Sequence, residues 1–161
     1  MDNHEYFLYH VPSEMGHFSL VASETALTHF FFDGEAPRFD TTLQETPLLQ
    51  KAATQLRQYL SGERRQFTVP LDPSGSDFFR RAWQALVAIP YGETRSYQQI
   101  AAALGNAKAC RAVGLANNRN PLPIFIPCHR VIGANQKLTG YRGGLPLKQS
   151  LLELEQRHAR I

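Results

Sequence analysis

Cys128 and His129 stand next to each other and are the residues best suited to nucleophilic chemistry. A thiol attacks as the thiolate, and an ordinary pKa of about 8.5 leaves only a small ionised fraction at neutral pH. His129 could act as the base, but neighbours in an extended segment point to opposite sides, so a turn or a bridging water would be needed. The dipeptide alone is weak evidence, because a structural cysteine beside a surface histidine is more common.

Glu155 is a candidate partner for that histidine. It lies four positions after Leu151, on the flank of the apolar side of its predicted helix. A carboxylate there could reach inward and orient an imidazole, as in a nucleophile, base and orienter chain. Position alone favours a solvated residue, so both roles stay open at this point.

A helix predicted over residues 107–117 is unusual because its side chains are small, with Gly114 in its interior. Glycine there costs roughly 0.5–1 kcal/mol relative to alanine. Either another helix packs tightly against it or a DNA backbone or groove wall does. Arg111 could then enter a groove, contact a phosphate or remain a surface charge. Tyr97, in the preceding helix, could donate a hydrogen bond or pack in the core.

The second half of the chain predicts the helices that position these residues. Ser96 and Gln99 form a capping box that opens a helix over about 97–104. The turn at Gly105 joins it to the small-residue helix, which predicts a helix-turn-helix. Further helices are predicted at 78–89 and 146–158.

The first half predicts a small sheet and one helix. Thr46 as N-cap and Pro47 at the first helical position begin the helix, and Gly62 ends it. Short segments rich in aromatic and β-favouring residues predict antiparallel strands at 5–11, 17–22 and 26–32, with one more short strand at 66–69.

Composition sets broad limits on the protein. The 161 residues are 43% apolar and 19% charged, which is ordinary globular usage and allows one good-sized domain or two small ones. The formal charge of +3 is compatible with nucleic acid without demanding it. Two cysteines make no disulfide framework, and their spacing does not resemble structural zinc. No signal peptide or membrane span is expected.

The segment Asn120-Pro-Leu-Pro-Ile-Phe-Ile-Pro-Cys-His-Arg-Val131 resembles the active-site segment of the O6-alkylguanine-DNA alkyltransferases, also called methylated-DNA–protein-cysteine methyltransferases. Its Pro-Cys-His-Arg-Val core is highly specific to that family. Similar segments lie in the expected order over about 77–156, whereas only the order of elements agrees over 1–70. They include Ser96-Tyr-Gln-Gln-Ile-Ala101, Arg111-Ala-Val-Gly-Leu-Ala-Asn117, Gly140-Tyr-Arg-Gly-Gly-Leu145 and Leu151-Leu-Glu-Leu-Glu155.

The resemblance implies catalytic roles for individual residues. Cys128 would accept the alkyl group, His129 would be its base through a water, and Glu155 would orient the histidine. Tyr97 would hydrogen-bond the purine and help the leaving guanine take a proton. Asn120 would be the hinge between the recognition helix and the segment that carries Cys128.

The resemblance also implies how DNA is bound. Arg111 would be the finger that fills the gap left by a flipped nucleotide, since O6 of a paired guanine is closed to in-line attack. A helix built from Ala and Gly suits the minor groove and offers no base-reading side chains, which implies lesion-directed binding. Further DNA contacts would come from Ser96, Ala112, Gly114 and Asn117, and the base pocket would be lined by Val131, Tyr141 and Arg142.

The predicted reaction is therefore irreversible DNA repair with one turnover per protein. The partner would be double-stranded DNA carrying O6-alkylguanine, with alkylthymine activity and cooperative binding of the monomer left open. No cofactor or metal is implied, and residues 1–70 contain no cysteine for a zinc site. Two alternatives remain: a lesion-sensing alkyltransferase-like protein, a class that characteristically lacks the cysteine, and a Cys-His hydrolase, which would leave the helix-turn-helix unexplained.

The expected architecture has two domains. Residues 1–70 would form an α/β domain with an RNase H-like antiparallel sheet, residues 71–76 a linker, and residues 77–161 a mostly helical winged-helix domain that carries the site. The expected location is the cytoplasm, with nucleoid association in a bacterium, or the nucleus in a eukaryote.

Overall fold

A computed structural model describes residues 5–159 of the chain. The chain divides into two compact units, Met1–Ser74 and Gly75–Ile161. The division falls within the segment 71–76 that the sequence suggests as a linker. Leu71 nevertheless belongs to the first unit, because it forms a bridge with Leu27.

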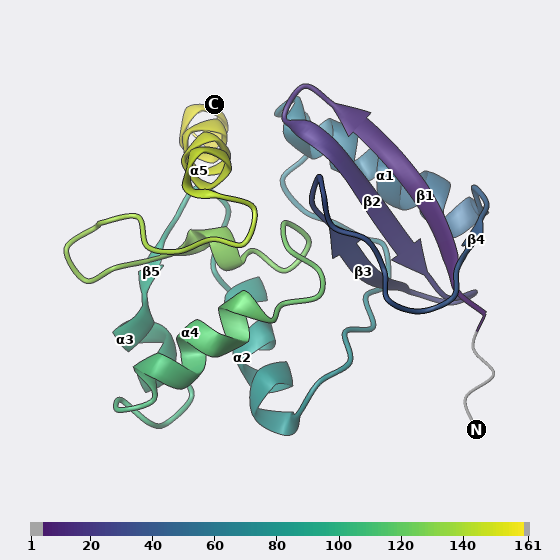
Figure 1. Ribbon diagram of the computed structural model, residues 1–161. Coiled ribbons are helices and arrows are strands. Elements are labelled where there is room, and N and C mark those ends of the chain that lie inside the picture. The colour runs from purple at the N-terminus through teal and green to yellow at the C-terminus, as the bar shows by residue number, and fades with distance from the viewer. Residues whose placement is uncertain (1–4, 160–161) are drawn as a thin grey trace. The chain divides into compact units, whose positions relative to one another are not determined.

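The first unit contains a four-stranded sheet in the order β3-β2-β1-β4 (Figure 1). Three antiparallel strands agree with the prediction, but β4 pairs parallel to β1, so the sheet is mixed and the purely antiparallel expectation is wrong. Because β4 has two exposed residues, it has no hydrophobic alternation that could have predicted it. The strands are β1 (Phe7–Ser13), β2 (Gly16–Ala22), β3 (Leu27–Phe31) and β4 (Thr42–Leu43).

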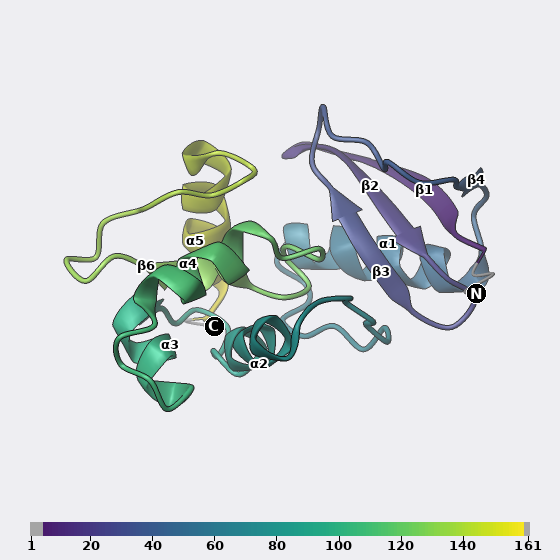
Figure 2. The same cartoon turned by 60° about the horizontal axis from the view of Figure 1, so that its bottom comes forward.

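Helix α1 (Pro47–Leu60) packs across one face of this sheet (Figure 2). The hydroxyl oxygen of Thr46 accepts a hydrogen bond from the Leu49 N–H at 3.2 Å, which confirms the predicted N-cap. Gly62, just beyond the helix, has a φ of 85°, a conformation that favours glycine. The core of the unit lies between the helix and the sheet and includes the buried Phe18, Leu20, Phe30, Leu49, Ala53 and Leu56.

The strand predicted at 66–69 is absent from the described structure. The side chain of Gln55 accepts a hydrogen bond from the Thr68 N–H at 2.9 Å and donates one to the Thr68 hydroxyl at 2.6 Å. The Gln55 side chain therefore bonds the Thr68 N–H, which in a strand would bond to a neighbouring strand. The backbone pairing occurs further along, where Leu27 bonds to Pro70 and Asp72, each at 2.9 Å.

The second unit is mostly helical, with one small parallel sheet in which β5 pairs with β6. Figure 2 shows α3 and α4 next to each other and α5 on the other side of the β5–β6 pair. The elements are α2 (Asp77–Val87), β5 (Arg95–Ser96), α3 (Tyr97–Ala103), α4 (Cys110–Asn118), the 3₁₀ turn η1 (Cys128–Arg130), β6 (Val131–Ile132) and α5 (Leu145–Ala159).

The predicted capping box at the start of α3 is confirmed. The Ser96 hydroxyl accepts from the Gln99 N–H at 3.1 Å, and the Gln99 side chain accepts from the Ser96 N–H at 2.8 Å. Helix α4, by contrast, begins at Cys110 and not near residue 107 as predicted. Asn106 holds the intervening residues in a turn, because its side chain and backbone oxygens accept from Lys108 and Ala109.

Helix α4 is anchored on its inner side by Trp83 of α2. The indole N–H donates to the Ala116 carbonyl at 2.9 Å, and Val113 and Ala116 are fully buried. A Cβ added at Gly114 would lie 3.9 Å from the Tyr97 ring, which is ordinary van der Waals contact. Packing within the second unit therefore does not require glycine at this position.

Candidate active site

Asn120 braces the loop that carries the nucleophile. The residue is fully buried, and its side-chain amide donates to the Ile126 carbonyl at 2.8 Å while its amide oxygen accepts from the Leu122 N–H at 2.9 Å. Between these contacts Ile124 adopts a φ of 73°, which is rare for a β-branched side chain. The loop is thus held in a strained shape by a residue at its own base.

Cys128 lies directly after this loop, as the first residue of η1. The residue is buried, with only 5% of its surface exposed. Burial raises the pKa of the thiol, while hydrogen bonding by Asn120 and the positive charges of Arg142 and Lys148 act in the opposite direction. The sulfur is therefore buried in polar and cationic surroundings and not in an apolar core.

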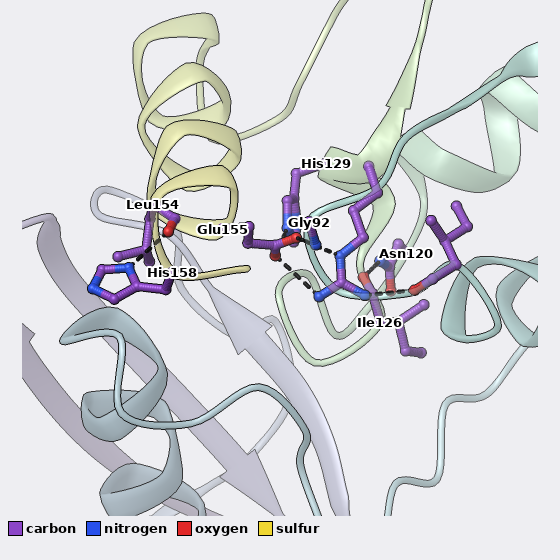
Figure 3. A network of polar contacts seen from close by, with 9 residues as sticks. Gly92, Asn120, Ile126, His129, Leu154, Glu155 and His158 are labelled. Carbon is purple, nitrogen blue, oxygen red and sulfur yellow. Dashed lines mark hydrogen bonds and ion pairs between the residues drawn. The ribbon is translucent and has the colours of Figure 1, made fainter. Parts of the chain in front are cut away.

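His129 and Glu155 form the pair that the resemblance implied. Nε2 of His129 lies 2.7 Å from Oε2 of Glu155, and both side chains are buried. Figure 3 shows the carboxylate reaching from α5 toward the imidazole. Since Nε2 is engaged by the carboxylate, Nδ1 is the ring nitrogen that can accept a proton from elsewhere.

Arg130 joins the same carboxylate and was not singled out from the sequence. Its Nε donates to Glu155 Oε1 at 2.8 Å and its Nη2 to Oε2 at 3.0 Å. The Gly92 N–H also donates to Oε1, at 3.1 Å (Figure 3). Glu155 therefore has three residues around its carboxylate, two from η1 and one from the segment before β5.

These contacts set the charges of the pair. Burial alone would raise the pKa of Glu155, but hydrogen bonds with His129 and Arg130 and the positive charge of the guanidinium outweigh it and lower the pKa to about 2. Burial lowers the pKa of His129, and Arg130 and Lys148 lower it further against the opposing effect of Glu155. The site therefore favours an ionised carboxylate beside a neutral imidazole.

Lys148 is a second buried cation that the sequence analysis missed. Its ammonium donates to the Val131 carbonyl at 2.7 Å and to the Thr139 carbonyl at 2.9 Å. It ties residues 133–144, which we call the active-site loop, to the strand that follows Cys128. Its position three residues before Leu151 and seven before Glu155 places it on the buried face of α5, and this spacing could have revealed it.

The predicted pocket residues lie on or beside the active-site loop. Burial raises the pKa of Tyr141 well above its ordinary value, and a negative charge at Cys128 would raise it further. The Arg142 guanidinium points to the end of α4, where it donates to the carbonyls of Asn118 at 3.1 Å and Asn120 at 2.8 Å. The predicted Val131 carbonyl already accepts from Lys148 and keeps one lone pair.

The residues predicted to bind DNA lie on α4, except Ser96, which ends β5 and caps α3. Arg111 is exposed at the second position of α4 and shares a helix face with the exposed Leu115 and Asn118. The hydroxyl of Tyr97 lies 2.9 Å from that of Thr139. The remaining predicted contacts are all half-buried: Ser96, Ala112, Gly114 and Asn117.

Residues 5–159 contain no group of three or more His, Cys, Asp or Glu side chains arranged to hold a metal ion. Within the same range, no helix is both long and apolar enough to cross a membrane.

The sequence matches two family models that together span most of the chain. Residues 6–73 match "6-O-methylguanine DNA methyltransferase, ribonuclease-like domain", and residues 77–157 match "6-O-methylguanine DNA methyltransferase, DNA binding domain". These matches confirm the expected fold class, a ribonuclease-like α/β domain followed by a helical DNA-binding domain.

Relatives and solved structures agree with this match. The chain is 45% identical over 153 residues to the methylated-DNA–protein-cysteine methyltransferase of Methanosarcina barkeri, covering 93% of this chain and 97% of the relative. It is 47% identical over 148 residues to the constitutive enzyme of that name from Bacillus subtilis, covering 88% and 90%. A crystal structure of Mycobacterium tuberculosis OGT in complex with DNA superposes with a TM-score of 0.89 at 45% identity and covers 94% of each chain. This chain therefore belongs to the 6-O-methylguanine DNA methyltransferase family.

Proposed function

We propose that this protein repairs DNA by direct reversal, moving the alkyl group of an O6-alkylguanine irreversibly onto Cys128. The observation that carries the proposal is the buried pair of His129 and Glu155, 2.7 Å apart. His129 immediately follows Cys128 in the sequence. Cys110, the other thiol, lies half-buried at the start of α4 with its sulfur 3.8 Å from the Ala107 carbonyl. The Cys110 sulfur thus contacts a main-chain oxygen, whereas the Cys128 sulfur is hydrogen-bonded by the Asn120 side chain.

The chemistry begins with the thiol proton. Because burial raises the thiol pKa, the proton leaves as the attack begins and passes through a water to Nδ1 of neutral His129. Glu155 then stabilises the imidazolium that forms. The sulfur bonds to the alkyl carbon while the bond from carbon to O6 breaks, and the electron pair of that bond stays on the guanine.

The guanine leaves as an anion that must take up a proton. Tyr97 supplies it from its hydroxyl, which is held at 2.9 Å from Thr139 at the edge of the active-site loop. The product is a thioether on Cys128, and no residue between 5 and 159 is placed to return it to the thiol. Each protein therefore performs one transfer.

DNA binding places the damaged base at the sulfur. We assign α4 to the minor groove of double-stranded DNA, with the exposed Arg111 entering the stack to replace the flipped nucleotide. Unstacking costs a few kcal/mol, which an inserted side chain helps to offset. Ser96, Ala112, Gly114 and Asn117 complete the contact surface, on which a half-buried Gly114 allows a groove wall to approach.

The flipped base is held by the active-site loop. Tyr141 and the backbone of Arg142 line the pocket, and the carbonyls of Cys128 and Val131 accept from the guanine amine. Asn120 acts as the hinge between α4 and the nucleophile, because its side chain bonds to both ends of the intervening loop. The protein acts as a monomer wherever the DNA is held, in the cytoplasm of a bacterium or the nucleus of a eukaryote.

Mass spectrometry tests the proposal directly. Incubation with duplex DNA containing O6-methylguanine should add one methyl group to the peptide that contains Cys128. The variant Cys110→Ser should behave like the natural protein, whereas Cys128→Ser should bind the DNA without gaining mass. A methyl group on Cys110, or repeated turnover with no mass gain, would overturn the assignment.

A further inference from the structure

Arg130 donates hydrogen bonds to three oxygen atoms, although the proposed reaction assigns it no step. Its guanidinium binds both oxygens of Glu155, at 2.8 and 3.0 Å, and its Nη1 donates to the Ile89 carbonyl at 2.7 Å. The group also lies 5.7 Å from the centre of the Tyr91 ring. With only 7% of the residue exposed, this geometry leaves little freedom to the side chain.

The bidentate contact changes the charge balance around His129. A buried carboxylate needs a counter-charge, and an imidazolium could supply it. Here a guanidinium supplies it instead, and arginine cannot lose its proton under protein conditions. The negative charge of Glu155 is therefore matched before His129 takes up any proton.

We propose that Arg130 is a positioning residue that keeps His129 neutral, and so able to accept the thiol proton, by matching the charge of Glu155. The inference rests on the proposed role of His129 as the base. Glu155 and Arg130 then have separate roles. Glu155 orients the imidazole through Nε2, and Arg130 prevents the carboxylate from keeping that imidazole protonated.

The charged groups around His129 support these separate roles of Glu155 and Arg130. From α5 it faces Glu155, which favours protonation, and Lys148, which opposes it. From η1, Arg130 opposes protonation, and the neighbouring Cys128 is the intended proton donor. Burial lowers the pKa of His129 in the same direction as the two cations. Removing the Arg130 charge would leave Glu155 facing fewer positive charges and would raise the pKa of His129.

The test compares the natural protein with Arg130→Met across about pH 5.5 to 9, using single-turnover reaction with O6-benzylguanine as a free base. A raised His129 pKa protonates the base at neutral pH, so the variant should be slow there and recover as pH rises. We expect the midpoint of its pH–rate profile to shift upward by about one unit or more. Arg130→Lys, which keeps the charge and loses the bidentate geometry, should react more slowly while its midpoint stays near that of the natural protein.

Two outcomes would overturn the inference. One is an Arg130→Met profile lowered by the same factor at every pH, which indicates a purely structural role. The other, which needs no variant, is a ¹⁵N NMR spectrum of the natural protein in which the His129 imidazole is protonated at neutral pH. Failure of the natural protein to alkylate Cys128 would instead reject the proposed function, so the two failures are distinguishable.

Discussion

The site segment and helix α4 are held in opposite ways. The site segment, residues 120–132, is held by hydrogen bonds of buried polar side chains. Asn120 bonds to two backbone groups, and His129 and Arg130 both bond to the carboxylate of Glu155. Helix α4 is anchored on its inner side by Val113 and Ala116 and presents Arg111 to solvent. The proposed chemistry therefore relies on contacts already made within the protein, whereas the face of α4 that carries Arg111 is proposed to find its partners on DNA.

This contrast predicts that substitutions in residues 120–132 and at their partner Glu155 lower stability and impair the chemistry together, whereas substitutions on α4 slow the reaction with DNA without lowering stability. Each of the following variants tests that separation, and they are ordered by the expected change in stability.

The largest effect is expected from Glu155→Gln. Neutralising the carboxylate leaves the Arg130 guanidinium buried without its counter-charge, which costs about 3–5 kcal/mol of unfolding free energy. Alkyl transfer should fall severely because His129 loses its orienting charge. Urea unfolding measures the first effect and single-turnover kinetics the second. Glu153→Gln, an exposed change on the same helix, should alter neither.

The same carboxylate predicts a dependence of stability on pH. The folded pKa of Glu155 is about 2 and lies below the unfolded value, so its ionisation stabilises the fold above about pH 4.3. That contribution is lost as pH falls from there toward 2. The unfolding free energy of the natural protein, measured between about pH 5 and pH 2, should show this loss, and that of Glu155→Gln should not. The same dependence on pH in both proteins would contradict the assigned pairing of Glu155.

A loss of stability of similar size, with a smaller effect on the reaction, is expected from Asn120→Ala. The change leaves the Ile126 carbonyl and the Leu122 N–H buried and unsatisfied, at about 1–3 kcal/mol for each group. It also removes a hydrogen bond that favours the Cys128 thiolate, so reaction with a free-base substrate should slow as well. Thermal unfolding and thiol titration measure the two effects, with the exposed Asn118→Ala as control. Normal stability in Asn120→Ala would mean that the loop is held by other contacts.

Gly114→Ala should move stability and activity in opposite directions. The added methyl group has room within the second unit, and alanine stabilises a helix interior by roughly 0.5–1 kcal/mol. If a groove wall approaches α4 here, repair of duplex DNA should slow while the reaction with O6-benzylguanine stays unchanged. An unchanged rate on duplex DNA would remove Gly114 from the DNA-contacting surface.

The smallest change in stability, within about 0.5 kcal/mol, is expected from Arg111→Ala, because the side chain is exposed. Repair of duplex DNA should nevertheless slow much more than the reaction with O6-benzylguanine, since a free base needs no flipping. Arg80→Ala removes an equally exposed charge from α2 and serves as control. Equal slowing of both substrates by Arg111→Ala would rule out the finger role.

Local chemistry was enough to predict much of the fold. The N-caps at Thr46 and Ser96 could be read from adjacent residues because their partners lie within a few positions. The short strand expected at 66–69 is wrong because Gln55, distant in sequence, bonds to Thr68. The start of α4 was misplaced because Asn106 diverts the chain into a turn.

The site divides along the same line. The roles proposed for Cys128, His129 and Glu155 follow from a resemblance carried by short motifs, and the structure brings His129 and Glu155 together. Arg130 and Lys148 were missed because their partners, among them Glu155 and Thr139, come from other segments. The burial of Cys128 was also missed, since burial depends on the whole unit and not on the motif.

The most direct test of the account is the number of alkyl groups that one protein chain can accept. With a large excess of duplex DNA containing labelled O6-methylguanine, we predict that transfer stops at one methyl group per chain, all of it on Cys128. Continued turnover, or label on any other residue, would contradict the claim that this prepared thiol is the final acceptor.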